Sequence, residues 1–241
     1  MTVYLFEFIG TAMLILIGNG VVANIVLKGT KGSDSGWTGI ALAWGMAVFI
    51  GVFISADVSG AHINPAVTLG LATAGKFAWE LVPGYMLAQV LGGMMGNLLV
   101  WLAYKKQYEA TKDLRAILAT FSTAPAIRSP FWNFVTEAIG TFALVFGVFY
   151  IAGGTISDEP IKLGALDALP VALLVVGIGF GLGGPTGYAI NPARDLGPRI
   201  MHALLPIKEK EGSDWGYAWV PVVGPLFGGF LAALVYLWIG V

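Results

Sequence analysis

Residues 60–67 read GAHINPAV and residues 187–194 read GYAINPAR, so the phrase Gly-x-x-Ile-Asn-Pro-Ala occurs twice. In each copy the proline, Pro65 or Pro192, opens a short, largely apolar segment. Proline suits the first turn of a helix, where its missing N–H would have had no partner, and asparagine is a favoured helix cap. Both segments are too short to cross a bilayer, which takes about 20 residues. We therefore predict two half-helices, capped by Asn64 and Asn191.

The composition indicates a chain that faces lipid. Hydrophobic residues make up 57% and charged residues 11%, whereas a typical soluble domain has about 25% charged residues. The formal net charge of −1 gives no sign of a nucleic-acid partner. With no cysteine and two histidines, the chain cannot form disulfides, thiolate nucleophiles or a histidine metal cluster. We expect no metal and no cofactor.

Six further apolar runs are long enough to span a bilayer. They cover residues 3–27, 37–56, 81–104, 131–153, 168–184 and 216–240. The pairs Gly92/Gly96 and Gly224/Gly228 have the small-xxx-small spacing that lets membrane helices approach closely. The sequence thus predicts an all-α membrane protein with six transmembrane helices and two re-entrant half-helices.

The two halves of the chain repeat each other. EFIGTAMLI at 7–15 resembles EAIGTFALV at 137–145, at nearly the offset that separates the two Asn-Pro-Ala copies. Each half holds three spans, an odd number, so the second half must enter the membrane from the opposite face, as in an inverted 3+3 repeat. We predict one channel domain over residues 1–241, with a first repeat at 1–104, a solvated connecting loop at 105–129 and a second repeat at 130–241.

Half-helices that enter from opposite faces would meet near the midplane, where irregular backbone must be buried or line a wet cavity. We expect the preceding segments, Gly60-Ala61-His62 and Gly187-Tyr188-Ala189, to be extended and to offer their carbonyls to a permeant solute. Each half-helix N-terminus carries roughly half a positive charge, and the asparagine amides add N–H donors. Such a centre accommodates a neutral hydroxyl-bearing solute and repels cations and protons.

These features resemble the aquaporin superfamily, the major intrinsic proteins. The resemblance covers nearly the whole chain and rests on the matched repeats, on Arg194 and on two motifs: Asn64-Pro65-Ala66 and Asn191-Pro192-Ala193. It implies a homotetramer in a bacterial cell membrane, with cytoplasmic termini and one pore in each protomer. It also implies that Glu7 and Glu137 accept hydrogen bonds from amides of the re-entrant loops, and that the His62 carbonyl lines the pore.

The resemblance further implies a constriction at Arg194, which donates to solute hydroxyls and repels cations. Trp44, Gly179 and Tyr188 would complete this filter: the two rings make an apolar corner, and Gly179 leaves room where water channels usually have histidine. The Tyr188 hydroxyl either faces the filter or turns away to bind backbone or water. Three markers match the glycerol-conducting branch of the family: Asp195, Pro221 and Val222.

We therefore expect a passive channel for glycerol and similar small uncharged solutes, with water permeation and exclusion of ions and protons. A water-selective pore of the same fold is the nearest alternative. An ion-coupled secondary transporter also fits an inverted repeat, but no Asp or Glu is obviously placed for a coupling ion. No Ser/His/Asp or H-E-x-x-H pattern supports an enzyme.

The basic residues conflict with the orientation that the resemblance implies. Loops 28–36, 105–129 and 199–214 lie on one face in this topology. They hold Lys28, Lys31, Lys105, Lys106, Lys112, Arg115, Arg128, Arg199, Lys208 and Lys210, and the opposite face holds Lys76 and Lys162. The positive-inside rule would place the basic loops in the cytoplasm. The family topology places them outside, and we follow the family.

Overall fold

The computed structural model describes residues 1–33, 35–151, 155–156, 159–160, 163–208 and 210–240. Within these ranges, six helical segments are long and apolar enough to cross a membrane. They are α1 (Thr2–Val26), α2 (Gly36–Ser59), η1 (Trp79–Leu81) running into α4 (Val82–Ala103), α7 (Pro130–Tyr150), η2 (Gly164–Ala168) running into α8 (Leu169–Leu182), and α10 (Val220–Ile239). The six predicted spans are confirmed. The fifth begins at Gly164, several residues before its predicted start, and this makes it long enough to span.

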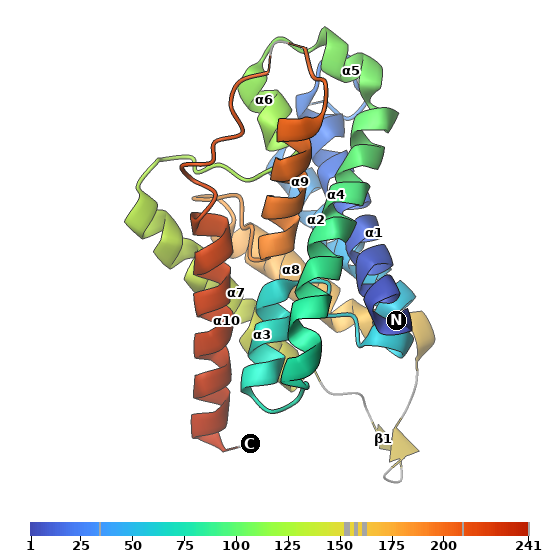
Figure 1. Ribbon diagram of the computed structural model, residues 1–241, viewed down its shortest axis with the longest axis vertical. Coiled ribbons are helices and arrows are strands. Elements are labelled where there is room, and N and C mark those ends of the chain that lie inside the picture. Colours follow the sequence, from blue (N-terminus) through green and yellow to red (C-terminus); the bar gives the residue numbers. More distant parts are fainter. Residues whose placement is uncertain (34, 152–154, 157–158, 161–162, 209, 241) are drawn as a thin grey trace.

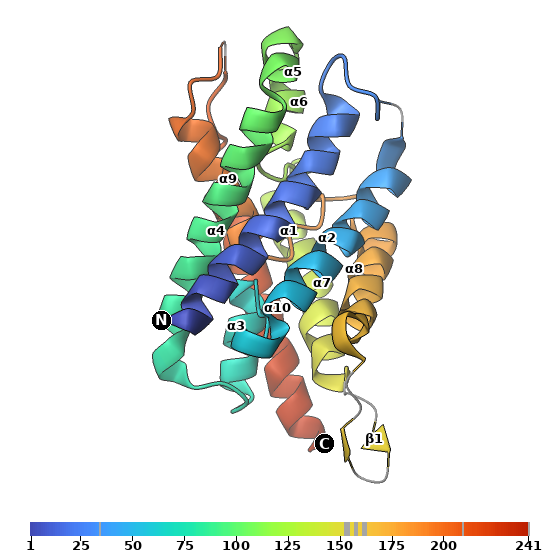
Figure 2. The same cartoon turned by 90° about the vertical axis from the view of Figure 1, so that its right-hand side faces the viewer.

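The two half-helices are α3 (Pro65–Thr73) and α9 (Pro192–Leu204). Figures 1 and 2 show α3 in the lower half of the bundle and α9 in the upper half, each surrounded by the long helices. In the first repeat α1 packs against both α2 and α4, and in the second α10 packs against α7. Each half-helix also packs on a long helix of the other repeat, α3 on α10 and α9 on α4. The two repeats therefore share one core.

Glycines allow the long helices to touch backbone to backbone. A Cβ atom added to Gly92 would lie 2.4 Å from the Phe8 carbonyl oxygen of α1, and one added to Gly96 would lie 2.4 Å from that of Ala12. The second repeat repeats this packing, since a Cβ on Gly228 would lie 2.2 Å from the Ala138 carbonyl oxygen of α7. The close approach predicted from the small-xxx-small spacing is confirmed.

The connection between the repeats differs from the prediction of a solvated loop. It contains α5 (Lys105–Ala110) and α6 (Leu114–Ala119). Tyr108, Ile117 and Phe121 are buried in one apolar cluster with residues of α1 and α4. Lys106 and Lys112 are exposed as predicted, and the apolar residues between the charged ones were overlooked. The connection is part of the packed bundle, and it lies at the upper end in Figure 1.

One small element departs from the all-helical pattern. The two-residue strand β1 (Thr155–Ile156) pairs antiparallel with β2 (Glu159–Pro160) between α7 and η2. It lies at the lower end of the view in Figure 1. The predicted end of the fourth span, residue 153, lies outside the described residues.

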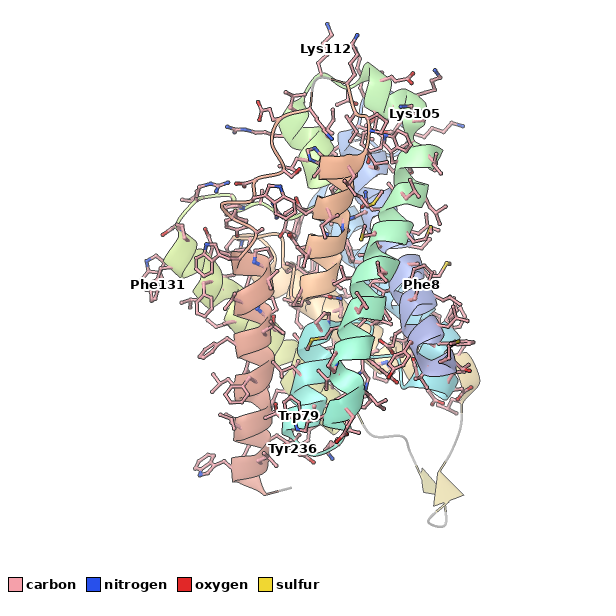
Figure 3. All side chains as sticks on the ribbon, viewed as in Figure 1. Phe8, Trp79, Lys105, Lys112, Phe131 and Tyr236 are labelled. Carbon is pink, nitrogen blue, oxygen red and sulfur yellow. The ribbon has the colours of Figure 1, made fainter. Side chains whose placement is uncertain are left out.

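The outer surface suits a bilayer. Large apolar side chains such as Leu87, Phe131 and Trp238 are 61%, 65% and 85% exposed on the flanks of the bundle. Figure 3 shows Lys105 and Lys112 at one end of the molecule, and Trp79 and Tyr236 toward the other. Aromatic residues are enriched at membrane interfaces, where their rings sit at headgroup level.

The basic residues do not all belong to loops. Arg199 lies inside α9 and is fully buried. The Nζ atom of Lys210 donates to three carbonyls at the C-terminal end of α9: His202, Ala203 and Leu205. Lys162 lies outside the described residues. Arg199 is therefore not a loop charge, and the other basic residues of these loops still conflict with the family orientation.

Candidate functional site

The repeated asparagines cap the two half-helices. Asn64 Oδ1 accepts from the Ala66 amide at 2.8 Å, and Asn191 Oδ1 accepts from the Ala193 and Arg194 amides at 3.0 and 3.2 Å. Pro65 and Pro192 occupy the first helical position in each case. The predicted cap-and-proline start of each half-helix is confirmed.

The same two side chains also join the repeats. Asn64 Nδ2 donates to the Ile190 carbonyl at 2.8 Å, and Asn191 Nδ2 donates to the Ile63 carbonyl at 2.9 Å. Each amide group carries two N–H donors, so this reciprocal pair uses one donor of each. Both asparagines line a cavity between the repeats, and Nδ2 of each makes no other hydrogen bond within the described residues.

The segments before the half-helices are not extended as predicted. The backbone takes positive φ at Gly60 (80°), Ala61 (51°) and Ile63 (43°). The second copy matches it, with positive φ at Gly187 (78°), Tyr188 (37°) and Ile190 (41°). A non-glycine residue in this region costs of order 1–3 kcal/mol and persists only where surrounding contacts fix it. The strain therefore implies that each loop is held from outside.

Two buried glutamates make those contacts. Glu7 Oε1 accepts from the His62 amide at 2.9 Å, and Oε2 accepts from the Ile63 amide at 2.7 Å. Glu7 also accepts from Ser59 Oγ and Gln89 Nε2, both at 2.7 Å. In the second repeat, Glu137 accepts from the Ala189 and Ile190 amides at 3.0 and 2.8 Å. Each carboxylate thus binds the strained loop of its own repeat.

A cavity of about 210 Å³ runs beside the paired half-helices. Gly60, Ala61, His62, Tyr188 and Ala189 line it together with Asn64, Asn191, Trp44 and Arg194, and the rest of its wall is apolar apart from Asp167. Among the sequence-predicted residues, Gly187 and Gly179 do not line it, and neither do the Pro-Ala pairs that follow the asparagines. The cavity wall is therefore a broad apolar surface with a few polar groups.

Arg194 is the cation of this cavity. It is 6% exposed, and its guanidinium carbon lies 4.1 Å from the centroid of the Trp44 ring. Its Nη1 donates to Asn19 Oδ1 at 3.1 Å, the one hydrogen bond that its guanidinium makes to protein within the described residues. A guanidinium has five N–H donors, so several remain for groups in the cavity.

Tyr188 fills the space that Gly179 leaves. A Cβ atom on Gly179 would lie 3.0 Å from Tyr188 Cζ and 3.1 Å from its hydroxyl oxygen. The Tyr188 ring also meets Trp37 edge to face at 5.6 Å, and Trp37 Nε1 donates to the Gly179 carbonyl at 3.0 Å. The Tyr188 hydroxyl is enclosed and has no hydrogen-bond partner among the described residues. Gly179 thus makes room for the tyrosine.

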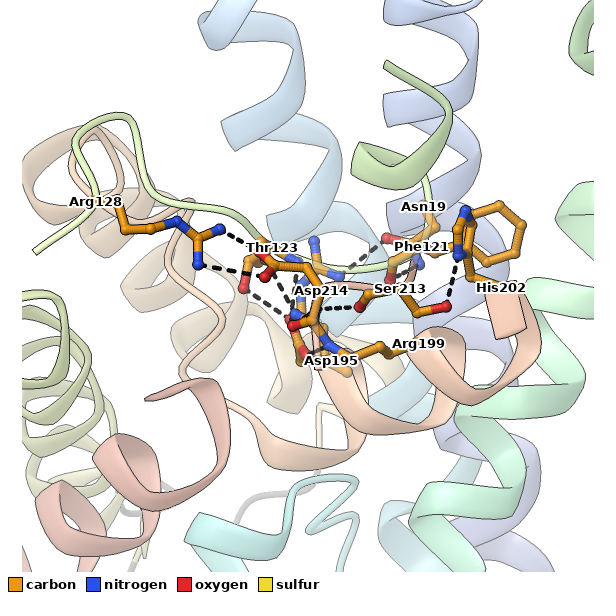
Figure 4. Close-up of polar contacts among 10 residues, drawn as sticks. Asn19, Phe121, Thr123, Arg128, Asp195, Arg199, His202, Ser213 and Asp214 are labelled. Atoms are coloured by element: carbon orange, nitrogen blue, oxygen red, sulfur yellow. Dashed lines mark hydrogen bonds and ion pairs between the residues drawn. The ribbon is translucent and has the colours of Figure 1, made fainter. Parts of the chain in front are cut away.

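The three branch markers lie behind the cavity. Asp195 is fully buried, where its Oδ1 pairs with Arg199 Nε at 2.7 Å and its Oδ2 accepts from the amide and hydroxyl of Thr123 at 2.8 Å. Pro221 and Val222 lie in the first turn of α10, outside the cavity lining. Figure 4 shows the Asp195–Arg199 pair beneath the connecting segment that carries Phe121 and Thr123.

Sequence reasoning missed several polar residues of the site. Asn19, Gln89 and Asn97 are fully buried in the long helices, and Thr123 belongs to the connection. A signal existed for the first three, because a polar side chain inside a membrane span is costly and tends to face the bundle interior. Nothing in the sequence connects Thr123 to Asp195, which is 72 positions away.

Six spans, two inverted half-helices and a cavity at their junction define a membrane protein of the channel class. A family model described as "Major intrinsic protein" matches residues 1–236. The chain belongs to the major intrinsic protein family, and the resemblance stated from sequence is confirmed.

Named relatives and a solved structure agree with this family. The chain is 53% identical over 230 residues to "Glycerol uptake facilitator protein 3" of Lactiplantibacillus plantarum, covering 95% of this chain and 93% of the relative. It is 52% identical over 239 residues to "Probable glycerol uptake facilitator protein" of Thermotoga maritima, covering 99% and 100%. The solved aquaglyceroporin from Plasmodium falciparum matches with a TM-score of 0.83 and 33% identity, over 97% of this chain and 93% of that one.

Proposed function

We propose that this protein is a passive channel for glycerol and similar small uncharged solutes, with accompanying water flow and exclusion of ions and protons. The observation that carries the proposal is the division of the cavity wall. Trp44 and Tyr188 supply ring faces, while Arg194 and the two asparagines supply N–H donors. A polyol has carbons along one edge and hydroxyls along the other, so it can meet both kinds of wall at once.

In this proposal the filter comprises Trp44, Gly179, Tyr188 and Arg194. Arg194 donates to solute hydroxyls and repels cations, and Gly179 acts indirectly by seating the Tyr188 ring. The Asn64 and Asn191 amides contact the solute oxygen at the midplane. The facilitators named above, at about half identity over nearly the whole chain, support glycerol as the solute. The protein needs no catalytic group or cofactor for this activity.

A water-selective pore is the second candidate, and one observation favours it. The Arg194 guanidinium lies 4.1 Å from the Trp44 ring centroid, about the distance of van der Waals contact. A solute that needs both groups must therefore move between them or displace the arginine, which is easier for water than for glycerol.

Stopped-flow light scattering on proteoliposomes separates the two candidates. Osmotic shrinkage reports water permeability, and re-swelling in a glycerol gradient reports glycerol permeability, both against empty liposomes. We expect both rates to rise well above the empty-liposome values. Water flow without glycerol flow, in protein shown to be folded, would contradict the glycerol assignment and favour the water-selective pore.

We further propose a homotetramer in the cell membrane, with both termini in the cytoplasm and with the repeat boundaries at residues 104 and 130. The chain has no cysteine, so a single cysteine introduced by Lys112→Cys or Lys76→Cys can be labelled from one side of intact cells. Labelling of the Lys112→Cys variant from outside supports this orientation, and labelling of the Lys76→Cys variant would reverse it. Native mass spectrometry reads the subunit number.

A further inference from the structure

We propose that Asn19 of α1 is a positioning residue for the solute pathway, which fixes the Arg194 guanidinium against Trp44 and so sets the preference between polyols and water. This inference rests on the proposed channel function and deepens it. Asn19 does not line the cavity, so it acts through Arg194 and not by contact with solute.

The first step is the contact between Asn19 and Arg194. Asn19 is fully buried, and its Oδ1 accepts the one guanidinium hydrogen bond to protein found within the described residues, at 3.1 Å. The same guanidinium lies over the Trp44 ring, with its carbon 4.1 Å from the ring centroid. A ring on one side and one acceptor at one nitrogen define both the position and the rotation of a planar cation. Asn19 therefore decides which of the remaining N–H donors point into the cavity.

The second step is that Asn19 is itself held. Its Nδ2 donates to Asn97 Oδ1 of α4 at 2.5 Å and to the Phe121 carbonyl of the connection at 3.2 Å. Both N–H donors and the acceptor of this amide are thereby used, which fixes its orientation and leaves Oδ1 facing Arg194. Figure 4 shows Asn19 beside the segment that carries Phe121.

The third step is that the segment carrying Phe121, which binds Asn19, is itself bound to α9, the half-helix that carries Arg194. Two residues after Phe121, the amide and hydroxyl of Thr123 donate to Asp195 at 2.8 Å, and Asp195 directly follows Arg194. A chain of hydrogen bonds and backbone thus runs from Arg194 through Asn19, Phe121 and Thr123, and returns to α9 at Asp195. The first repeat has no equivalent, because Val67 occupies the position of Arg194.

The test compares Asn19→Ala with Asn133→Ala in proteoliposomes. Asn133 is a matched control: it is also a buried asparagine with two hydrogen bonds to the connection, to Ser129 N and the Ile127 carbonyl, and it does not contact Arg194. For Asn19→Ala we expect the ratio of glycerol to water permeability to change by about three- to tenfold, the size of an ordinary lost hydrogen bond. Asn133→Ala should leave the ratio within about twofold of the original.

A conservative variant separates positioning from general structure. Asn19→Asp keeps an acceptor for Arg194 Nη1, so its permeability ratio should lie closer to that of the original protein than the ratio of Asn19→Ala does. Where Asn19→Ala does not fold, Asn97→Ala takes its place, because it removes the support of Asn19 and leaves the Arg194 contact. We then expect a smaller shift in the same direction.

Cryo-electron microscopy gives a readout that does not depend on the solute. We expect the Arg194–Trp44 separation, 4.1 Å here, to increase in Asn19→Ala and to stay unchanged in Asn133→Ala. Arg194 still seated on Trp44 in Asn19→Ala, or equal permeability ratios in the two variants, would overturn the inference. Absence of glycerol flow in the unaltered protein would instead overturn the proposed function, and the Arg194–Trp44 separation would still decide the role of Asn19.

Discussion

The two half-helix regions have nearly the same backbone and different chemistry. Both loops take positive φ at matched positions, both bind a glutamate from the first helix of their repeat, and both end in an asparagine cap. Yet α3 presents Val67 and Thr68 where α9 presents Arg194 and Asp195. The backbone and the asparagine cap are thus the same in the two half-helix regions, whereas the positive charge of Arg194 occurs only in the second.

The buried polar contacts around the two half-helices also differ in charge. Around α3 the buried partners of Glu7 are neutral: Ser59 Oγ, Gln89 Nε2 and two backbone amides. Behind α9 lies a buried ion pair, Asp195–Arg199, whose side chains are both fully enclosed. Both regions have neutral hydrogen bonds to one carboxylate, and the second region has a buried ion pair in addition.

Replacing either glutamate by alanine should destabilise the protein, and Glu7→Ala should have the larger effect. Glu7→Ala leaves three donors without an acceptor, because Ser59 Oγ also reaches the Ser55 carbonyl at 3.2 Å, whereas Glu137→Ala leaves two backbone donors. At about 1–3 kcal/mol for each buried unsatisfied donor, we expect Glu7→Ala to lower the free energy of unfolding by roughly 3 kcal/mol or more, and Glu137→Ala by about two thirds as much. Unfolding titrations in mixed detergent measure both. Equal losses would contradict the comparison.

Breaking the ion pair should affect only the second region. Asp195→Ala leaves Arg199 as a buried charge without its carboxylate, which costs about 3–5 kcal/mol. The matched change in the first region, Thr68→Ala, removes a hydroxyl that contacts His62 and Gln89 and should cost about 1 kcal/mol. The same titrations compare the two variants. A Thr68→Ala loss as large as that of Asp195→Ala would show that the first region also depends on this position.

Exchanging the side chains at the asymmetric position should change selectivity. We expect Arg194→Val to lower the ratio of glycerol to water permeability about tenfold and to raise proton leak, because the donors and the positive charge of the filter are lost. Val67→Arg would place a second cation in the same cavity and should block glycerol. Proteoliposome re-swelling and a pH-sensitive dye report the two effects. Unchanged selectivity in Arg194→Val would exclude Arg194 as the filter.

The smallest expected effect concerns Tyr188, whose counterpart in the first loop is Ala61. Since its hydroxyl is enclosed and has no hydrogen-bond partner in the part of the chain that the structure describes, Tyr188→Phe should leave both permeabilities within about twofold and stability unchanged or higher by about 1 kcal/mol. Thermal unfolding and re-swelling measure these quantities. A large fall in glycerol flow alone would show that the hydroxyl reaches the solute during passage.

The spans, the two half-helices and the inverted repeat could be predicted from the sequence because each depends on short local patterns that occur twice. Asn-Pro fixes a helix start, apolar length fixes a span, and two similar copies reveal the inversion. The positive φ values were not predictable in the same way, because Ala61 and Tyr188 have no intrinsic preference for that region. It accompanies glutamate contacts to the residues that follow them, His62 and Ile63 in the first loop and Ala189 and Ile190 in the second.

Contacts between distant segments were also beyond the sequence. The connection was expected to be solvated, yet Phe121 and Thr123 reach Asn19 and Asp195 across long stretches of chain. Such contacts depend on how helices stack, which composition does not encode. Asn19 itself could have been singled out, since a polar residue in an apolar span needs a partner.

The reciprocal bonds between Asn64 and Asn191 bear on how flux depends on conditions. Any rocking of one repeat against the other would break both bonds at the centre of the molecule. A pore tied in this way has no conformational cycle to complete for each solute molecule. Transport through it should rise in proportion to the concentration gradient without saturating at low concentration, and should vary with temperature no more steeply than diffusion in water.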